Sequence, residues 1–485
     1  MPSQHPTYAA IDFGASSGRV LTGTIVGGQV DLTEHHRFAN TPVRLPGGLH
    51  WNLLNLFSES VGALRGMHHL RGIGVDTWAV DYGLLDARHE LLGLPFHYRD
   101  GRSDALVGEA FDRVSRAEQY AIAGIQTLPF NTIFQLLADQ DGPALSAATR
   151  LAMVPDLIGL WLTGELANER TNASTTGLLD ARTGDWSEGL IQRIGLPTQL
   201  FTELVDPGHR LGPTLPHLDV GSVPVYTVAS HDTASAFVGA PIVDDHCAVL
   251  SSGTWSLLGL ELPAPVLTEA AQAADLTNER GIDGTTRLLK NVMGLWLEQE
   301  CSRTWGIGHA ELFALATQST VEAPLFDPDR PEFLQPGDMP RRIAEACVDA
   351  GQAAPEGAGG TVRSILTSLA CKYRYVLELL EQVSGREIRR IHVIGGGSQV
   401  ALLCRLTADI TGREVLAGPV EATAIGNVLV QARADGELGS LADIRAVAAA
   451  SAHPEHFEPS ADQAASESTY QRFLAVTGLS QPALA

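Results

Sequence analysis

The chain has 485 residues, with 33 Lys or Arg against 56 Asp or Glu, so its formal net charge at pH 7 is −23. A single hydrophobic core rarely holds so many residues, and we expect two domains or more. An acidic chain without a basic stripe is a poor partner for nucleic acids, because phosphate binding requires clustered positive charge. The composition is that of a globular protein without low-complexity segments.

The cysteines are widely scattered and include no Cys-x-x-Cys pair. They are Cys247, Cys301, Cys347, Cys371 and Cys404. Neither a zinc site nor a disulfide framework is expected, and we predict a reducing compartment. The first eight residues lack the pattern of a signal peptide, and no apolar run approaches membrane-spanning length. We therefore expect a cytoplasmic protein with no membrane partner.

The first predicted elements form an antiparallel β-meander. Apolar residues lead to Asp12, a turn-prone segment follows at residues 14–18, and alternating residues then resume a strand. A second turn at Gly27 and Gly28 precedes a third predicted strand at residues 29–38. Asp12 is thereby placed at the end of the first strand.

Helical and strand patterns alternate in the next part of the chain. The spacing predicts a helix within residues 51–70, a strand pair at 71–86, a helical region at 105–124 and a short apolar helix at 155–164. The Ser- and Thr-rich residues 172–176 are predicted to be an exposed loop.

An aspartate stands where a β-rich run gives way to small helix-forming residues. This pattern predicts a strand that delivers Asp232 to the N-terminus of a helix. The helix dipole and the free N–H groups there favour an ionised carboxylate. A plain N-cap without catalytic role fits the same pattern. His231 is expected to point away from Asp232, because neighbours alternate in an extended chain, and so to contact substrate or to pack.

The design of the N-terminal hairpin returns in the second half of the chain. Residues 248–260 form two strand-like runs around a bend at Gly253 and Thr254. A glycine bend lined by hydroxyl and amide groups suits phosphate. Two similar hairpins about half a chain apart predict two lobes, residues 1–240 and residues 241–485, with a cleft between them.

The C-terminal part carries helical and glycine-rich patterns. We predict a helix starting in residues 290–299, a long amphipathic helix at 361–383, a strand, triple-glycine turn and helix at 390–403, a strand-to-helix turn at 419–427, and a loose terminal helix from 448. The three glycines fit either a tight turn that lets a helix approach a strand or contact with a nucleotide.

Several common catalytic signatures are absent. The chain has no Gly-x-x-x-x-Gly-Lys-Ser/Thr and no Gly-x-Gly-x-x-Gly after a strand, and neither Gly-x-Ser-x-Gly nor a credible Ser/His/Asp set stands out. The carboxylates Asp76, Asp81 and Asp86 leave glycoside hydrolysis open, although acids at strand ends more often cap turns or bind hydroxyl groups.

Six motifs, in chain order, resemble those of the FGGY carbohydrate kinases. They are Ala10-Ile-Asp-Phe-Gly-Ala-Ser-Ser-Gly-Arg19, Gly74-Val-Asp-Thr-Trp-Ala-Val-Asp81, Gly124-Ile-Gln-Thr-Leu-Pro-Phe-Asn131, His231-Asp-Thr-Ala-Ser-Ala236, Ser251-Ser-Gly-Thr-Trp-Ser256 and Gly395-Gly-Gly-Ser398. Within that family the first hairpin resembles the rhamnulokinase branch. The resemblance implies an α/β fold of two actin/Hsp70-like (ribonuclease H-like) lobes, with mixed sheets flanked by helices and a central cleft. It also implies that ATP and Mg²⁺ serve to phosphorylate L-rhamnulose to L-rhamnulose 1-phosphate.

The resemblance further implies roles for single residues, with sugar and catalysis in the N-terminal lobe and the nucleotide in the C-terminal lobe. Asp232 would be the general base, and Asp12 would hold the metal. The implied sugar contacts are Ala79, His231, Asp232, Thr233 and Asn291. The implied ATP contacts are Ala15, Ser16, Ser17, Gly18, Arg19, Thr254, Gln299 and Gly396.

Two departures from the branch pattern concern the sugar. Ala79 stands where rhamnulokinases usually have Gly, and Ala229-Ser230 where many have Gly-Asn. A kinase for another ketose or polyol, such as L-fuculose or xylulose, therefore stays open, as does a non-catalytic ATP-dependent protein of the same fold. We expect a monomer or a weak homodimer.

Overall fold

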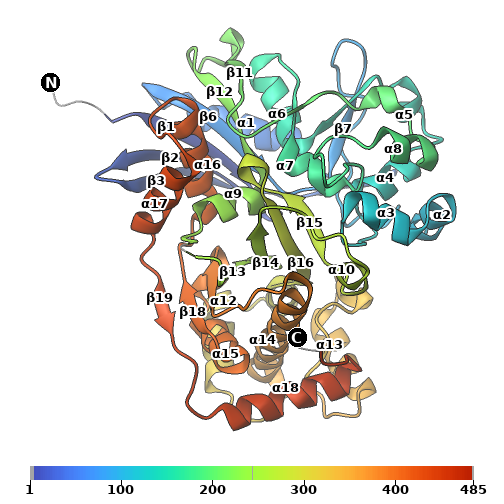
Figure 1. The fold of residues 1–485 in the computed structure, drawn as a ribbon, viewed down its shortest axis with the longest axis vertical. Helices are drawn as coiled ribbons and strands as arrows, with labels where there is room; N and C mark the ends of the chain where they lie inside the picture. The colour runs from blue at the N-terminus through green and yellow to red at the C-terminus, as the bar shows by residue number, and fades with distance from the viewer. Residues whose placement is uncertain (1–4, 243, 483–485) are drawn as a thin grey trace. The chain divides into compact units, whose positions relative to one another are not determined.

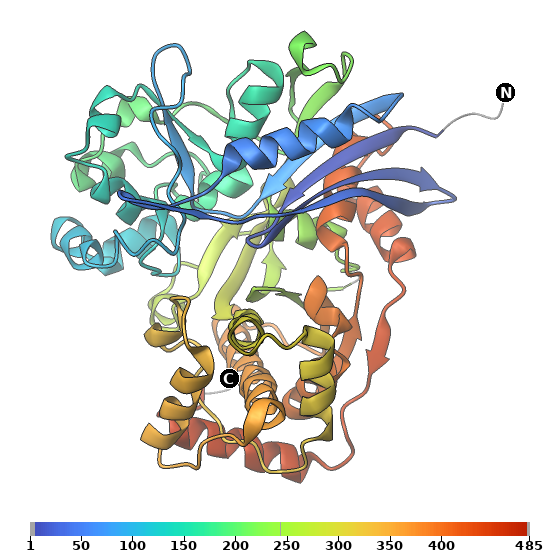
Figure 2. The ribbon, with the colours of Figure 1, turned by 180° about the vertical axis from the view of Figure 1, so that it is seen from behind.

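The computed structural model describes residues 5–242 and 244–482 (Figures 1 and 2). Residues 1–4, used above in judging a signal peptide, lie outside the described residues. The chain divides into two compact units: Met1–Pro241, Glu261–Leu288 and Ala422–Ser451 form the first, and Ile242–Leu260, Leu289–Glu421 and Ala452–Ala485 form the second. Six segments imply five passages between the units, where the sequence pattern predicts a single boundary near residue 240.

The first unit is built on a six-stranded mixed sheet with the order β11-β12-β6-β1-β2-β3. The strands are β1 (Thr7–Phe13), β2 (Ser17–Val26), β3 (Gln29–Ala39), β6 (Leu70–Thr77), β11 (Arg210–Pro213) and β12 (Pro224–His231). β1, β2 and β3 pair antiparallel, which confirms the predicted meander. β6 is parallel to both β1 and β12, so these three strands end at the same edge.

Helices cover both faces of this sheet. They are α1 (Leu53–Leu64) on one face, and α9 (Asp232–Gly239), α16 (Ala422–Ala434) and α17 (Leu441–Ser451) on the other (Figures 1 and 2). Ala424 and Val428 of α16 pack on Tyr8 and Ala10 of β1. The last helices of this unit thus complete the core that the first strand begins.

The rest of the first unit is mainly helical and has its own hydrophobic core. Its helices are α2 (Leu106–Arg113), α3 (Arg116–Ala123), α4 (Thr132–Ala138), α5 (Pro143–Ala147), α6 (Val154–Thr163), α7 (Arg170–Ala173), α8 (Glu188–Ile194) and α10 (Glu269–Ala273). Short strands accompany them: β4 (Val43–Leu45), β5 (Gly48–His50), β7 (Tyr82–Leu85), β8 (Arg150–Met153), β9 (Asn168–Glu169), β10 (Leu204–Val205) and β15 (Thr277–Arg280). β4 pairs with β5, β7 with β8, and β9 with β10.

Two predictions for this region are wrong. The runs within residues 71–86 are both strands, but β6 and β7 lie in different sheets, because the chain turns between them at Val80, whose φ is +68°. Residues 172–176 are a buried helical segment and not an exposed loop. The hydroxyl groups there satisfy backbone carbonyls three residues earlier, as Ser174 Oγ does with Thr171 O at 2.8 Å, so a polar segment can be buried.

The second sheet has seven strands in the order β15-β16-β14-β13-β17-β18-β19. The bounds not yet given are β13 (Cys247–Ser252), β14 (Trp255–Leu262), β16 (Thr286–Met293), β17 (Arg390–Ile394), β18 (Glu414–Ala417) and β19 (Glu455–Phe457). β13 and β14 form the predicted hairpin, and β13, β17 and β18 run parallel. Residues 290–293 belong to β16, so the predicted helix starts only at Trp296.

The helices of the second unit are α11 (Trp296–Trp305), α12 (His309–Gln318), α13 (Met339–Asp349), α14 (Gly357–Ser384), α15 (Ala401–Thr411) and α18 (Gln463–Thr477). The long α14 agrees with its prediction. The terminal α18 is not loose: Tyr470 and Phe473 are fully buried against Cys371 and Ile410. In the described part of the chain, no helix is both long and apolar enough to cross a membrane.

Candidate active site

Asp232 lies at the first turn of α9, directly after β12, as the sequence pattern predicts. Its Oδ1 accepts hydrogen bonds from the backbone N of Thr233 at 2.6 Å and from Thr233 Oγ1 at 3.2 Å. Among the described residues, Oδ2 has no hydrogen-bond partner, and the side chain is 31% exposed. Burial raises the pKa of Asp232, while His231 opposes the rise and Asp12 adds to it. Burial therefore acts against the ionising effect that the helix N-terminus was expected to have.

The side chain of His231 does not point away from Asp232. Its Nε2 lies 3.3 Å from Asp232 Oδ1, because strand alternation ends where the chain turns into α9. The other ring nitrogen, Nδ1, lies 3.2 Å from Arg287 Nη2 and 3.3 Å from Glu279 Oε2. The side chain is only 7% exposed, so the protein itself surrounds both ring nitrogens.

Sequence reasoning missed Glu279 and Arg287. Glu279 is 4% exposed and Arg287 is fully buried, and their charged groups lie 3.1 Å apart. Burial favours the protonated Glu279, but the Arg287 charge together with contacts to His231 and Thr277 outweighs burial, and the pKa of Glu279 is lowered. The available signal was a charged residue inside the strand-like run of residues 286–293, since such charges are rarely buried unless paired.

Two further carboxylates lie at the same sheet edge. Asp12 on β1 stands opposite Asp76 on β6 in the parallel register, and Arg19 pairs with Asp12. Asn427 donates a 2.6 Å hydrogen bond to Asp76 Oδ2, whereas the buried Oδ1 has no hydrogen-bond partner in the described part of the chain. Burial raises the pKa of Asp76 well above its usual range, and the charge of Asp12 adds to the rise. Burial therefore favours the protonated form of Asp76 beside Asp12, an effect that its sequence context did not reveal.

At Ala229-Ser230, where the sequence departs from the branch pattern, the structure shows a contact made by Ser230. Glu169 Oε2 accepts hydrogen bonds from the backbone N of Ser230 at 3.0 Å and from Ser230 Oγ at 2.7 Å. Both Ala229 and Ser230 are buried. The hydroxyl group of Ser230 is thus used to hold the end of β12 in place.

Asp81 is a buried acceptor for several donors. Its Oδ2 accepts from Trp51 Nε1 at 2.6 Å and Trp78 Nε1 at 3.0 Å, and its Oδ1 from Gln135 Nε2 at 2.8 Å. Trp51 and Trp78 stack with ring centroids 3.8 Å apart, next to the half-buried Ala79. Asp86 instead caps a turn through the backbone N of Arg88 and Glu90. Neither acid is available for glycoside hydrolysis.

The β1–β2 hairpin carries the residues expected to bind phosphate. Ala15 and Ser16 form its tip, and Ser17, Gly18 and Arg19 begin β2. Ser16 is exposed, while Ala15 and Ser17 are half-buried. Asn40 braces the bend through hydrogen bonds of 2.9 Å to Gly14 O and 3.0 Å to Ser16 O.

In the second unit, the structure brings Thr254 and Gln299 together: Thr254 Oγ1 donates to Gln299 Oε1 at 3.3 Å. The backbone N of Trp296 also bonds to Thr254 O at 3.1 Å, which fixes the start of α11 against the β13–β14 bend. Asn291, half-buried, lies on β16 in the same unit.

The three glycines after β17 differ in their surroundings. A Cβ at Gly397 would lie 2.0 Å from Ser252 Oγ, and one at Gly395, where φ is +79°, would lie 3.0 Å from Ser252 O. A Cβ at Gly396 would meet no atom within 4 Å. Gly395 and Gly397 thus serve close packing, and Gly396 is the one that faces open space.

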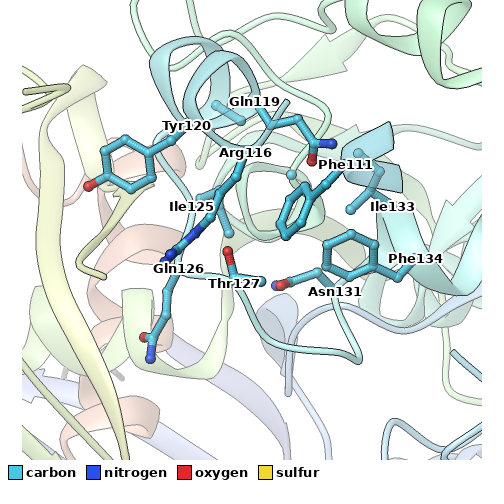
Figure 3. A pocket seen from close by; sticks show the side chains of 12 residues that line it. Phe111, Arg116, Gln119, Tyr120, Ile125, Gln126, Thr127, Asn131, Ile133 and Phe134 are labelled. Carbon is cyan, nitrogen blue, oxygen red and sulfur yellow. The ribbon is translucent and has the colours of Figure 1, made fainter. Parts of the chain in front are cut away.

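The motif at residues 124–131 lines a small pocket of the first unit (Figure 3). Thr127 and Asn131 lie beside Phe134 and Phe111 there, while the Gln126 side chain extends away from them (Figure 3). None of the predicted site residues is among those that line this pocket.

Comparison with protein families decides the classification. The N-terminal domain of the FGGY family of carbohydrate kinases matches residues 7–239, and the C-terminal domain of that family matches residues 248–434. The chain belongs to the FGGY family of carbohydrate kinases. As an FGGY kinase it is an enzyme, and kinases of this family use ATP as the phosphoryl donor.

Curated relatives extend over nearly the whole FGGY chain. The rhamnulokinase of Bacteroides thetaiotaomicron is 40% identical over 96% of this chain and 98% of its own. That of Enterococcus faecalis is 40% identical over 96% and 97%, and that of Bacillus subtilis 38% over 91% and 93%.

Solved structures confirm the predicted fold class, two α/β lobes whose mixed sheets are flanked by helices. A xylulose kinase from Lactobacillus acidophilus matches with a TM-score of 0.79 over 97% of both chains, at 14% identity. A glycerol kinase from Plasmodium falciparum matches with a TM-score of 0.76 over 98% of both chains, also at 14% identity. At such identities the likeness concerns the fold alone.

Proposed function

We propose that this enzyme transfers the γ-phosphoryl group of ATP to L-rhamnulose and forms L-rhamnulose 1-phosphate. The observation that carries this proposal is the 40% identity to a rhamnulokinase over 96% of the chain. The arrangement around Asp232 supplies a chemical reason, because one of its oxygens is held by the protein and the other is left for a substrate.

Asp232 is proposed to be the general base. Thr233 holds Oδ1, so Oδ2 is the atom that would accept the proton of the sugar hydroxyl as its oxygen bonds to phosphorus. The raised pKa of Asp232 makes this carboxylate a stronger base than an exposed one. In a loose transition state the proton leaves late, so positioning matters more than base strength. His231, Thr233, Ala79 and Asn291 are proposed to contact the sugar.

The nucleotide is proposed to bind to residues of the second unit and to the first hairpin. The contact between Thr254 and Gln299 supports a shared role at the phosphates and nucleotide. The open surroundings of Gly396 support it as the glycine that a nucleotide approaches. Residues 15–19 are proposed to surround the transferring phosphate, because small residues at a hairpin bend offer N–H and hydroxyl donors.

Mg²⁺ is proposed as the metal, held by Asp12. Such an ion on a kinase is bound mainly by phosphates and water, with only one or two carboxylates from the protein. The residues present fit this chemistry: Asp12 is 5% exposed at the strand end, and the buried Oδ1 of the neighbouring Asp76 has no hydrogen-bond partner among the residues that the structure describes. When bound, the metal would offset the charge on the phosphates, and Arg19 would keep Asp12 oriented.

A sugar panel tests the proposal. The enzyme would be assayed with Mg-ATP and L-rhamnulose, L-fuculose, xylulose or glycerol, with ADP release and sugar phosphate measured separately. We expect kcat/KM to be highest with L-rhamnulose. A higher value with another ketose would assign that ketose instead, and ADP release without any sugar phosphate would contradict kinase action on these acceptors.

The remaining proposals concern the state of the protein. Free, buried thiols fit a reducing compartment, and we propose a cytoplasmic location. We also propose a monomer or weak homodimer without nucleic-acid partners, which sedimentation velocity with and without added DNA would test.

A further inference from the structure

The ring of His231 lies between two charged groups, and this fixes where its proton must be. Arg287 Nη2 lies 3.2 Å from Nδ1 with hydrogen-bond geometry. A guanidinium can only donate, so Nδ1 must be the acceptor. A neutral imidazole then carries its hydrogen on Nε2, and Nε2 is the atom 3.3 Å from Asp232 Oδ1.

The opposite tautomer conflicts with these contacts. A hydrogen on Nδ1 could face Glu279 Oε2 at 3.3 Å, but it would also face the N–H groups of Arg287. It would further leave the lone pair of Nε2 against the carboxylate of Asp232. Glu279 Oε2 has no hydrogen-bond partner among the described residues, but it lies 3.1 Å from Arg287 Nη2 as the counter-ion of that group.

Arg287 is itself firmly held. It is fully buried, its Nε donates to Arg280 O at 3.2 Å, and its guanidinium carbon lies 5.9 Å from the ring centre of Phe237 on α9. A buried cation at this place favours one orientation of His231.

We propose that Arg287 and Glu279 are a positioning pair, which fixes His231 in the Nε2–H tautomer so that His231 donates to Asp232 Oδ1 and leaves Oδ2 for the sugar hydroxyl. This inference rests on the proposed role of Asp232 as the base. Thr233 donates to Oδ1 through its backbone N and its Oγ1, and a hydrogen on His231 Nε2, 3.3 Å away, would be a third donor to the same oxygen. The rotation of Asp232 that would turn Oδ2 away from the substrate is thereby opposed.

The tautomer can be measured on the unmodified enzyme. The protein would be labelled with ¹⁵N-histidine, and the His231 signals identified by their absence from the spectrum of His231→Gln. We expect a pyrrole-type Nε2 and a pyridine-type Nδ1. A protonated Nδ1, in either the other tautomer or the imidazolium form, would overturn the proposal without any reference to catalysis.

The positioning role is tested by removing both charges at once. Arg287→Gln/Glu279→Gln avoids leaving a lone buried charge, which would threaten folding. We expect kcat for sugar phosphorylation to fall about 10-fold or more, the scale of a hydrogen bond to a charged group, with KM for ATP unchanged. An unchanged kcat in the folded double variant would contradict the proposal.

A matched control exists at the other end of α9. Arg445 pairs with Glu261 at 2.6 Å and bonds to Val238 O at 3.2 Å. Arg445→Gln/Glu261→Gln should lower stability but leave kcat unchanged, and an equal loss of kcat would show that the effect is merely structural.

Failure of this inference can be told apart from failure of the proposed function. If Asp232→Asn is inactive while the Arg287/Glu279 double variant has wild-type kinetics, Asp232 remains the base and the positioning pair is refuted. If Asp232→Asn turns over like the wild type, the assignment of the base itself falls.

Discussion

At the scale of single residues, the site depends on a difference between the two carboxylate oxygens of Asp232. The carboxylate of Asp232 has protein donors at Oδ1 and, within the described residues, none at Oδ2. The side chain of an ordinary N-cap aspartate accepts hydrogen bonds from the backbone N–H groups of its helix. Here only the next residue is bonded, and the second oxygen remains available for chemistry.

Replacing Asp232 by Asn should separate catalysis from folding. The amide keeps the size and an acceptor for Thr233 but cannot take a proton, so we expect kcat to fall by about 10²-fold or more. Thermal unfolding and ATP binding should stay near those of the wild type. Asp338→Asn, at the N-cap of α13, serves as a control and should retain full activity.

Asp81 should make a pH-dependent contribution to the stability of the folded protein. Burial raises the pKa of Asp81 from 3.8 to about 7. The folded state then binds this proton more tightly than the unfolded chain, so the stabilisation is full below about pH 4 and is lost as the pH rises through about 7.

The variant Asp81→Asn should show this directly. Its NH₂ group would meet the donors of Trp51, Trp78 or Gln135, and we expect a loss of about 1–3 kcal/mol in unfolding free energy. Denaturant unfolding at several pH values would measure it. The difference in unfolding free energy between the variant and the wild type should narrow as the pH rises from about 5 to about 8. A difference that widens over this range would contradict the predicted direction of the pH dependence.

Sequence reasoning placed some site residues better than others. The places of Asp12 near the end of β1 and of Asp232 at the start of α9 were predicted correctly, because a strand end and a helix start are local patterns. The orientation of His231 was predicted wrongly, because alternation holds only while the strand continues. Arg287 and Glu279 could not be assigned, since their importance lies in contacts with residues about 50 positions away.

At the scale of elements, α9 is held by unusually close packing against α16. A Cβ at Gly426 would lie 1.9 Å from Ser235 O, and one at Gly239 would lie 2.1 Å from Ala422 O. Only glycine allows the backbones to approach in this way. The helix that carries Asp232 is therefore fixed by backbone contact as well as by side chains.

Gly426→Ala should destabilise the protein. The added methyl group must displace backbone of α9, and we expect a loss of about 1–3 kcal/mol, typical of overpacking. Gly62→Ala in α1 is the matched control, because its Cβ would meet nothing within 4 Å. That variant should gain about 0.5–1 kcal/mol from helix propensity, and equal effects of both changes in calorimetry would refute the packing argument.

A substitution in the β13–β14 bend should weaken ATP binding and leave the proposed general base unaffected. Thr254→Val removes the hydroxyl that contacts Gln299, and we expect KM for ATP to rise about 3- to 10-fold, the scale of one hydrogen bond, with kcat little changed. Thr317→Val on α12, whose hydroxyl bonds only to Phe313 O at 2.8 Å, should leave KM unchanged. An unaltered KM in Thr254→Val would argue against phosphate contact at this bend.

Elements with strong local patterns were predicted well, and those that depend on tertiary contacts were not. The meander of β1, β2 and β3 and the long α14 follow from periodicity and glycine turns. The segment at 172–176 was misjudged because hydroxyl side chains that bond to their own backbone resemble a solvated loop. β19 was missed, since three residues give no periodic signal.

At the scale of the whole molecule, the repeated hairpins correctly indicated two lobes, but not which segments complete them. Residues 261–288 and 422–451 return to the first unit. Nothing local in these segments marks that return, because what fixes it is packing, such as that of Val428 on Tyr8. Composition and motifs therefore indicate the family more reliably than they indicate where the chain passes between the lobes.

The cysteines give a prediction for the chain as a whole. All five are buried thiols, and burial raises the pKa of Cys347 to about 11 and that of Cys404 to about 12. Thiols that are both buried and protonated react slowly. A chromogenic disulfide reagent at neutral pH should modify fewer than about one thiol in the native protein and all five after unfolding. Rapid reaction of several thiols in the native state would contradict this.

The late position of α16 in the chain affects how the protein can be made. β1 leaves the ribosome long before α16, the helix that covers Tyr8 and Ala10 and ends at Ala434. A nascent chain must therefore keep an apolar sheet face uncovered until α16 has been made, and chaperones have access to that face in the meantime. For the same reason, a fragment that stops at residue 241 should aggregate when expressed alone, and supplying a peptide with the sequence of α16 should improve its solubility.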